Sequence, residues 1–383
     1  MNRIILIGNG FDLAHGLKTS YADFIDWYWK EWGKRLLHGQ SKKEEDRLCS
    51  FEIKDDIELD MWYYVWHGYY YKRKEPWIPW DEHQVVELAK QNSDLCSFSI
   101  KSGFFSEVCK DVETKGWVDI ENVYYSYLSS GVIEPKVIND DLDYLREKLV
   151  EYLSDIQKSI TDDIIKEGLR GMMKVHVREK DIAYSSWDQF SLDDLFGKQK
   201  NLPERILLLN FNYTTLADLY LPDQVRNSPN HIHGRLSNPN SIIFGYGDEL
   251  DENYKKIVNK NNNEYLRNIK SVKYLESSNY RHLLEFIESS PYQIFIMGHS
   301  CGNSDRTLLN TLFEHKNCVS IKPFYYIRKD GTDNYMELVQ NISRNFTDMK
   351  LMRDRVVNKT FCEAYSDARE QVPSSDNGRE KVD

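Results

Sequence analysis

The sequence predicts an α/β protein built around a parallel β-sheet with helices on both faces. Three aliphatic runs, at residues 4–7, 205–209 and 293–297, each end in a cluster of glycine, asparagine or histidine. Strands buried on both faces are continuously apolar rather than alternating, and such strands are typical of parallel sheets. A segment compatible with a helix follows each run. This order is that of a repeated strand–turn–helix unit.

The first of these units contains the most informative turn. Gly8 and Gly10 directly follow the aliphatic residues 4–7. Glycines in the first turn of a parallel sheet let backbone N–H groups approach an anion, and the helix that follows adds a partial positive charge. The glycine fingerprint of dinucleotide-binding proteins is incomplete here, because Leu13 occupies the position of its third glycine.

A long segment then interrupts the α/β pattern. A helix is expected at residues 21–32, after a helical turn that Gly16 interrupts. Beyond it, charged runs and helical stretches such as residues 141–167 replace the strand–glycine–helix unit. The expected organisation is an α/β core at residues 1–32 and 200–350, a mostly helical insertion at residues 33–199 and a flexible tail at residues 364–383.

The α/β pattern returns after residue 200 and continues to the end of the core. The expected strands are residues 205–209, 241–244, 293–297 and 320–327, and the expected helices are residues 216–220, 249–268, 280–289, 306–315 and 334–345.

Composition narrows the classes of function. The 383 residues include 61 acidic and 50 basic side chains, a formal net charge of -11, which argues against a surface that coats DNA or RNA. The six cysteines are scattered without a C-x-x-C pair, so neither a zinc ribbon nor a disulfide framework is indicated. The apolar run at residues 4–7 is far shorter than a signal peptide or a membrane span. We therefore expect a cytoplasmic protein that binds small molecules or proteins.

Residues 61–80 interleave tryptophan and tyrosine with the basic residues Lys72, Arg73 and Lys74. Such a pattern can stack bases and hold phosphates, as in proteins that bind single strands. It also suits a packed helix face or a subunit contact, where aromatic side chains dominate the energetics. We favour the packing interpretation because the chain is acidic overall.

Two carboxylates precede another predicted helix. Asp119 is placed to cap this helix, and Glu121 lies in its first turn, where a negative charge is favourable. The same pair can bind a metal or position a substrate, but no histidine lies at ligand spacing. The capping interpretation is therefore favoured.

The polar clusters after the predicted strands indicate a ligand site. In an open parallel sheet, ligands bind at the carboxyl ends of the strands, so these clusters are expected to meet in one crevice. They are Gly8-Asn9-Gly10, Asn210-Phe211-Asn212, Phe244-Gly245-Tyr246-Gly247 and Gly298-His299-Ser300. Their convergence is stronger support for a site than any one cluster.

Individual residues of this set also have ordinary structural explanations. Asn212 suits a turn, and Asp305 suits a helix N-cap. A lone histidine is more often structural than catalytic. His233 differs because Gly234 follows it and allows close backbone approach, and because it lies between two candidate strand-end loops.

Together these residues resemble the AbiH family of bacteriophage abortive-infection proteins. The resemblance spans about residues 1–345. The motifs that carry it are Gly8-Asn9-Gly10-Phe11-Asp12, Trp117-Val118-Asp119-Ile120-Glu121, Phe211-Asn212-Tyr213-Thr214, His231-Ile232-His233-Gly234, Phe244-Gly245-Tyr246-Gly247 and Gly298-His299-Ser300 through Ser304-Asp305. More distantly, the order of these motifs is similar to that of the Sir2-like domains of bacterial defence NADases and the sirtuin deacylases.

This resemblance implies a Rossmann-like, Sir2-like fold that binds NAD as a substrate or ligand, with no metal. Gly8 and Gly10 would face the pyrophosphate, Asn212 would contact the ribose and the reaction centre, and His233 would be the catalytic base. The implied cofactor contacts are Gly8, Asn9, Gly10, Phe11, Asp12, Tyr213, Gly245, Tyr246, Gly298, His299, Ser300 and Asp305.

The chain also departs from the sirtuin pattern. Sirtuins carry a threonine and an aspartate beside the asparagine, where this chain has Asn210 and Thr214. It also lacks their four-cysteine zinc module. A protein deacylase is therefore disfavoured, whereas NAD hydrolysis or binding of an NAD derivative stays open.

The leading expectation is an antiviral effector that hydrolyses NAD⁺ to ADP-ribose and nicotinamide. The insertion would sense a phage protein trigger or form the interface of a homo-oligomer, with no nucleic-acid or membrane partner. One alternative is a non-catalytic module that senses a nucleotide or an ADP-ribose signal. Another is a nucleic-acid-acting effector that uses residues 61–80 with Asp119 and Glu121.

Overall fold

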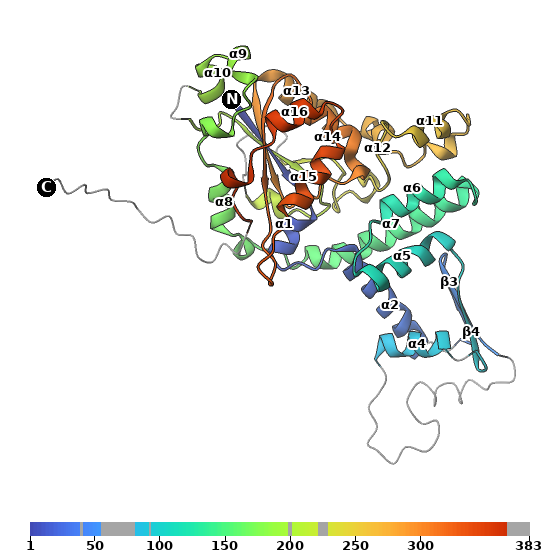
Figure 1. Cartoon of the computed structure of the whole chain (residues 1–383). Helices are drawn as coiled ribbons and strands as arrows, with labels where there is room; N and C mark the ends of the chain where they lie inside the picture. The colour runs from blue at the N-terminus through green and yellow to red at the C-terminus, as the bar shows by residue number, and fades with distance from the viewer. Residues whose placement is uncertain (39–40, 55–80, 92, 198–200, 221–228, 366–383) are drawn as a thin grey trace.

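The computed structural model describes residues 1–38, 41–54, 81–91, 93–197, 201–220 and 229–365. Its core is a five-stranded sheet in which all neighbouring strands run parallel (Figure 1). The strands are β1 (Asn2–Ile7), β5 (Ile206–Asn210), β6 (Asn230–His231), β7 (Tyr292–Met297) and β8 (Cys318–Phe324), in the spatial order β6–β5–β1–β7–β8. The predicted parallel sheet is confirmed, and its strand order is that of a doubly wound α/β protein.

Helices cover both faces of this sheet, as predicted (Figure 1). Ile4 and Leu6 of β1 belong to one hydrophobic cluster, and Ile5 and Ile7 to another, because successive side chains of a strand point to opposite faces. The first cluster includes residues of α13 (Asn279–Ser289), α14 (Arg306–Phe313), α15 (Tyr335–Arg344) and α16 (Met349–Arg355), and the second includes residues of α1 (Asn9–Ala14) and α8 (Glu167–Met173). The continuous aliphatic runs therefore reflect burial on two sides.

The predicted strand at residues 241–244 is wrong. Ile243 is buried in irregular structure, where its N–H donates to the His233 carbonyl over 2.9 Å and its own carbonyl accepts from the Tyr213 hydroxyl over 3.1 Å. The place beside β5 is taken by β6. An apolar run between turn residues indicates burial but does not by itself specify strand conformation.

Several predicted helices have different bounds, and the helix expected at residues 21–32 extends to residue 38 as α2 (Tyr21–His38). The polar segment at residues 249–268 contains only the short helices α11 (Glu252–Val258) and η5 (Asn263–Tyr265), which are separated near Asn261, a residue with the left-handed φ of 50°. The helix expected at residues 141–167 is α7 (Pro135–Gln157), which starts earlier because its proline occupies the first turn.

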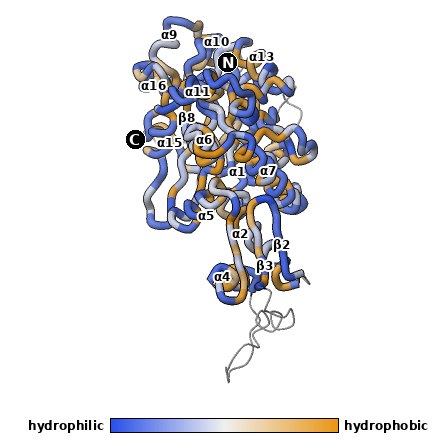
Figure 2. Tube along the Cα trace, turned by 90° about the vertical axis from the view of Figure 1, so that its right-hand side faces the viewer, coloured by the Kyte–Doolittle hydropathy of each residue, from blue (hydrophilic) through white to orange (hydrophobic). Residues whose placement is uncertain are grey.

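The segment between α1 and β5 is rich in helices but also contains a small sheet. Its strands β2 (Lys43–Glu45), β3 (Cys49–Ile53) and β4 (Cys96–Ile100) are antiparallel, and the sequence analysis did not predict them. β2 is a hydrophilic edge strand (Figure 2). The helices are α2 (Tyr21–His38), α4 (Glu82–Gln91), α5 (Gly103–Lys115), α6 (Ile120–Ser130), α7, α8, α9 (Ser186–Gln189) and α10 (Leu192–Phe196). The aromatic stretch at residues 61–80 lies outside the described residues.

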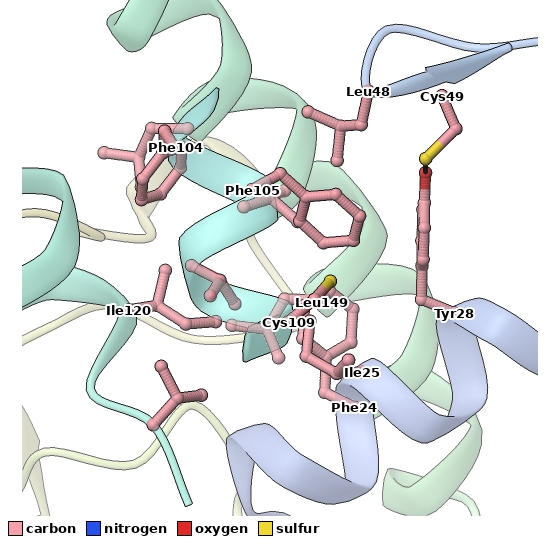
Figure 3. Packing of buried hydrophobic residues seen from close by; sticks show 14 of the residues in the cluster. Phe24, Ile25, Tyr28, Leu48, Cys49, Phe104, Phe105, Cys109, Ile120 and Leu149 are labelled. Carbon is pink, nitrogen blue, oxygen red and sulfur yellow. Dashed lines mark hydrogen bonds between the residues drawn. The ribbon is translucent and has the colours of Figure 1, made fainter. Parts of the chain in front are cut away.

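The insertion shares one hydrophobic cluster with loops of the α/β core. Phe24 and Tyr28 of α2 pack near Phe105 and Cys109 of α5 (Figure 3), and the rings of Tyr28 and Phe105 meet at 4.9 Å. The same cluster continues into the α/β core, since it also includes the buried side chains Tyr213, Phe244 and Tyr246. The insertion is therefore packed against the loops that follow the sheet strands. Within the described residues, no helix has the length and apolar character of a membrane span.

Candidate functional site

A cavity lies where the strand order of the sheet reverses. β5 and β6 are on one side of β1, and β7 and β8 are on the other, so the connections that follow β1 and β7 leave in opposite directions. Ligands of doubly wound proteins bind at this point. The cavity has a volume of about 1100 Å³ and is lined by residues that follow β1, β5, β7 and β8. This volume is slightly larger than the roughly 300–1,000 Å³ typical of small-molecule pockets, so a ligand of dinucleotide size is compatible with it.

Most of the predicted site residues line this cavity, namely Gly8, Asn9, Gly10, Asp12, Asn212, Tyr213, His233, Gly298, His299, Ser300 and Asp305. The other three do not. Phe11 points into the core beside α8. The Gly245 N–H donates to Oε1 of Glu121 over 3.1 Å, and the ring of Tyr246 stacks on Tyr125 with centroids 3.8 Å apart. These three residues therefore pack behind the residues that line the cavity.

The glycines pack two loops together backbone to backbone. The Gly10 N–H donates to the Gly298 carbonyl over 2.8 Å, and a Cβ atom at Gly8 would lie 2.5 Å from Cα of His299. Gly298 has a φ of +78°, and a Cβ there would lie 2.2 Å from the backbone N of Phe11. Contact between the β1 and β7 loops therefore requires these glycines, whether or not an anion binds beside them.

Asn212 is held in a fixed orientation at the floor of the cavity. Its Nδ2 donates to the Gly8 carbonyl over 3.0 Å and to Oδ1 of Asp12 over 2.7 Å, while its backbone N–H donates to Oδ1 of Asn210 over 3.0 Å. Thr214 donates to the other oxygen of Asp12 over 2.7 Å. Oδ1 of Asn212 accepts no hydrogen bond within the described part of the chain. It is thus available to a ligand hydroxyl or a water.

His233 is buried beside a carboxylate. Its Nε2 lies 3.2 Å from Oδ1 of Asp305 and 3.2 Å from the Tyr274 hydroxyl. Burial lowers the pKa of His233, and the nearby Lys270 ammonium lowers it further, whereas Asp305 raises it. The imidazole is therefore neutral near pH 7. The tautomer that donates from Nε2 to the carboxylate leaves Nδ1 as the proton acceptor.

Asp305 also belongs to a buried ion network. Lys270 Nζ lies 2.8 Å from Oδ1 of Asp305 and 2.8 Å from Oε2 of Glu121, and these three side chains are exposed by only 1%, 10% and 9%. Burial raises the pKa of Glu121 to about 7, although Lys270 opposes this effect. Burial also acts to raise the pKa of Asp305, but Lys270 and His233 outweigh it and hold that pKa well below its ordinary value. Glu121, Lys270 and Asp305 all line the cavity.

Comparison with protein families gives one match. The family described as bacteriophage abortive infection AbiH matches residues 4–327, which include β1, the insertion and the loops that form the cavity. The chain belongs to the AbiH family. Membership in this family indicates a role in bacterial defence against phage by abortive infection. No curated protein and no solved structure matches the chain.

The sequence analysis of this AbiH protein missed Lys270 and Tyr274. Both are in short helices after an irregular loop, and no glycine cluster or strand end marks them. The partners of Lys270 are 149 and 35 residues away, so their contact is decided by the tertiary structure.

Asp119 caps a helix in the AbiH chain, as predicted. Its Oδ1 accepts the Asn122 N–H over 3.1 Å at the start of α6. It also lines the cavity, so its structural role does not remove it from the site. Glu121, in contrast, points to Lys270 rather than acting only through the helix dipole. Among the residues that the structure describes, no group of three or more histidine, cysteine, aspartate or glutamate side chains is placed to hold a metal ion.

We expect Asp12 to make the stability of the AbiH protein dependent on pH. Burial raises the pKa of Asp12 to about 6, although hydrogen bonds from Thr214 and Asn212 oppose this rise. The unfolded value is about 3.9. The folded state therefore binds this proton more tightly, so the stabilisation is fully present below pH ~4 and is lost as the pH rises through about 6.

The free energy of unfolding of the wild type, measured relative to that of Asp12→Asn, should fall by roughly 2 kcal/mol between pH 4 and pH 7. Urea denaturation of both proteins across this range measures the difference. A difference that does not change with pH would show that the pKa of the Asp12 carboxyl group is not raised in the folded protein.

Proposed function

We propose that this AbiH protein is an abortive-infection effector that binds NAD⁺ in the cavity and hydrolyses its nicotinamide–ribose bond, in a Rossmann-like site of the Sir2-like type. The observation that carries the proposal is that Asn212 and His233 line one cavity. Phe211, which precedes Asn212, contacts the His233 ring with centroids 5.2 Å apart, and both polar side chains line the same cavity. The doubly wound strand order supports a nucleotide at this position.

The charges around the cavity suit a dinucleotide. Four cationic side chains line it. Lys270 is paired with Glu121 and Asp305, and the other three, Lys166, Arg328 and Lys329, can attract the pyrophosphate of NAD⁺. Aromatic side chains such as Tyr21 and Tyr326 also line the cavity and offer faces on which a base can stack. The cavity is also lined by the carboxyl groups of Asp12, Asp119, Glu121 and Asp305, so the pyrophosphate is expected beside the three cations and away from these groups.

The residues of the site supply what hydrolysis of this bond requires. Nicotinamide leaves as a neutral molecule, so no acid is needed for the leaving group. Water then bonds to the ribose carbon C1′ and releases one proton. The free Oδ1 of Asn212 accepts a hydrogen bond from the ribose hydroxyl or from this water, and thereby orients it. Neutral His233 accepts the proton, and Asp305 stabilises the imidazolium that forms.

The test is NAD⁺ consumption by the purified full-length protein, with and without divalent metal, together with NAD⁺ levels in infected cells. Formation of ADP-ribose and nicotinamide in equal amounts without metal would support the proposal. Saturable NAD⁺ binding without turnover, in the purified protein and during infection, would instead support a non-catalytic nucleotide sensor. Activity on nucleic acid that requires metal would support a nucleic-acid-acting effector.

A further inference from the structure

The insertion contributes a charged side chain to the site. Glu121 belongs to α6, whereas Lys270 and Asp305 belong to the α/β core. The contacts run from Glu121 Oε2 to Lys270 Nζ (2.8 Å), from Lys270 Nζ to Asp305 Oδ1 (2.8 Å), and from Asp305 Oδ1 to His233 Nε2 (3.2 Å). Four buried polar side chains thus form one chain of contacts that starts in the insertion and ends at the proposed base.

Stability alone does not explain this network. Removing charges from water is costly, and replacing a buried ion pair with apolar side chains of similar volume is often neutral or stabilising. The Lys270 side chain is only 1% exposed and has a carboxylate on either side. All four residues also line the cavity rather than the hydrophobic cores. Their position therefore points to a role in the reaction.

We infer that Glu121 and Lys270 are positioning residues that act on His233 through Asp305 and control whether His233 can accept a proton. Their importance for turnover rests on the function proposed above. Their effect on the proton affinity of His233 follows from the contacts themselves. The insertion thereby becomes part of the catalytic site, and the α/β core alone lacks one member of the network.

The direction of the effect follows from the charges around His233. The groups that face it are Asp305, His299, Tyr274 and Lys270, and behind them lie Glu121, Asp119 and Tyr213. Burial has the largest effect and lowers the pKa of His233, Lys270 lowers it further, and Asp305 raises it. Removing the Lys270 charge should therefore raise this pKa. Replacing Glu121 should lower it by a smaller amount, because Lys270 is then less compensated, but Glu121, with a pKa of about 7, is only partly ionised where His233 titrates.

The chain offers a matched control in Lys322 of β8. This lysine is also 1% exposed and also lies between two carboxylates, 3.3 Å from Asp181 and 2.6 Å from Glu363. It does not line the cavity. Lys322→Met therefore leaves one buried carboxylate, Asp181 (2% exposed), and one partly exposed carboxylate, Glu363 (43% exposed), without their lysine. Because Lys322 does not line the cavity, this change should leave the titration of His233 unchanged.

The experiment compares wild type, Lys270→Met, Lys270→Arg, Glu121→Gln and Lys322→Met. Two quantities are measured, namely the acid limb of kcat/KM for NAD⁺ and the NMR titration of the His233 ring, which is assigned from the signal lost in His233→Ala. In Lys270→Met both midpoints should move to higher pH by about one unit or more. In Glu121→Gln they should move to lower pH, and Lys270→Arg should stay close to wild type because it keeps the charge.

Shifts in the same direction in Lys270→Met and Glu121→Gln, or an equal shift in Lys322→Met, would overturn the inference. If Lys270→Met does not fold, Glu121→Gln and Lys270→Arg still test it. A shifted NMR titration in a protein that does not consume NAD⁺ would retain the effect on His233 and reject the proposed function. NAD⁺ consumption with an unshifted titration would reject the inference and retain the function.

Discussion

Replacing His233 with alanine is expected to lower the rate of NAD⁺ hydrolysis by roughly 10²–10⁴-fold, which is the usual contribution of a general base. His233 is buried against Asp305, and its lowered pKa keeps it unprotonated near neutral pH. No other described histidine combines a place on the cavity with a direct contact of this length to Asp305, since His299 is 3.6 Å away. Steady-state kinetics of ADP-ribose release at pH 7 measure the loss.

His315→Ala is the control for removal of a histidine. His315 pairs with Glu288 over 3.1 Å and does not line the cavity, so its loss should leave kcat/KM within about twofold of wild type. A fall of similar size in both variants would indicate general damage to the fold. Full activity in His233→Ala would remove this residue from the reaction.

Asn212→Ala should also abolish most turnover. Asn212 can act by contacting the substrate or by holding Asp12, and Thr214→Val serves to compare these two roles. Each variant removes one hydrogen bond to Asp12, but only Asn212→Ala removes the free amide oxygen. Asn212→Ala also removes the hydrogen bond to the Gly8 carbonyl, so a much larger loss of activity in this variant would indicate that Asn212 does more than hold Asp12. Equal losses would indicate that both residues act only by holding Asp12.

Gly298→Ala is expected to cause the largest loss of stability, about 2–4 kcal/mol in the free energy of unfolding. Two costs add at this position. The φ of +78° disfavours any residue with a Cβ, and that atom would lie 2.2 Å from the backbone N of Phe11. Backbone atoms have little freedom to move, so the β1 and β7 loops would separate and the floor of the cavity would open.

Gly116→Ala measures the cost of a positive φ without the cost of a close backbone contact. Gly116 has a similar φ of +72°, but nothing lies within 4 Å of a Cβ at that position. Its substitution should cost only about 1 kcal/mol. Urea denaturation of both variants measures the difference, which is the cost of the close approach between the loops. Equal effects would show that the two loops are not in tight contact.

The α/β core was predictable because its signals are local. A strand buried on both faces needs a continuous apolar run, and a tight turn into a helix favours glycine. Both appear at residues 4–10 and again at residues 293–298. The parallel pairing of β1 with β7 then brings Gly8 and His299 together. Most of the predicted site residues line the cavity for this reason.

Other features of the fold were not predicted. The run at residues 241–244 is as apolar as a strand, but it is irregular because β6 occupies the position beside β5. The strand β2 lies in a charged run, whereas β3 (CSFEI) and β4 (CSFSI) alternate apolar and polar residues, a local strand signal that the prediction overlooked. At residues 241–244 and in β2, neighbours distant in sequence decided the conformation, and backbone pairing outweighed local preference.

The sequence by itself determined the parallel sheet, the turns at its carboxyl edge and the position of Asn212 and His233 beside that edge, because strand burial and turn geometry depend on adjacent residues. Only the tertiary structure decided that Lys270 joins Glu121 to Asp305, since these contacts span 149 and 35 residues. The physical reason is that a buried charge is tolerated only with its partners around it. Those partners are supplied when the insertion packs against the loops of the core.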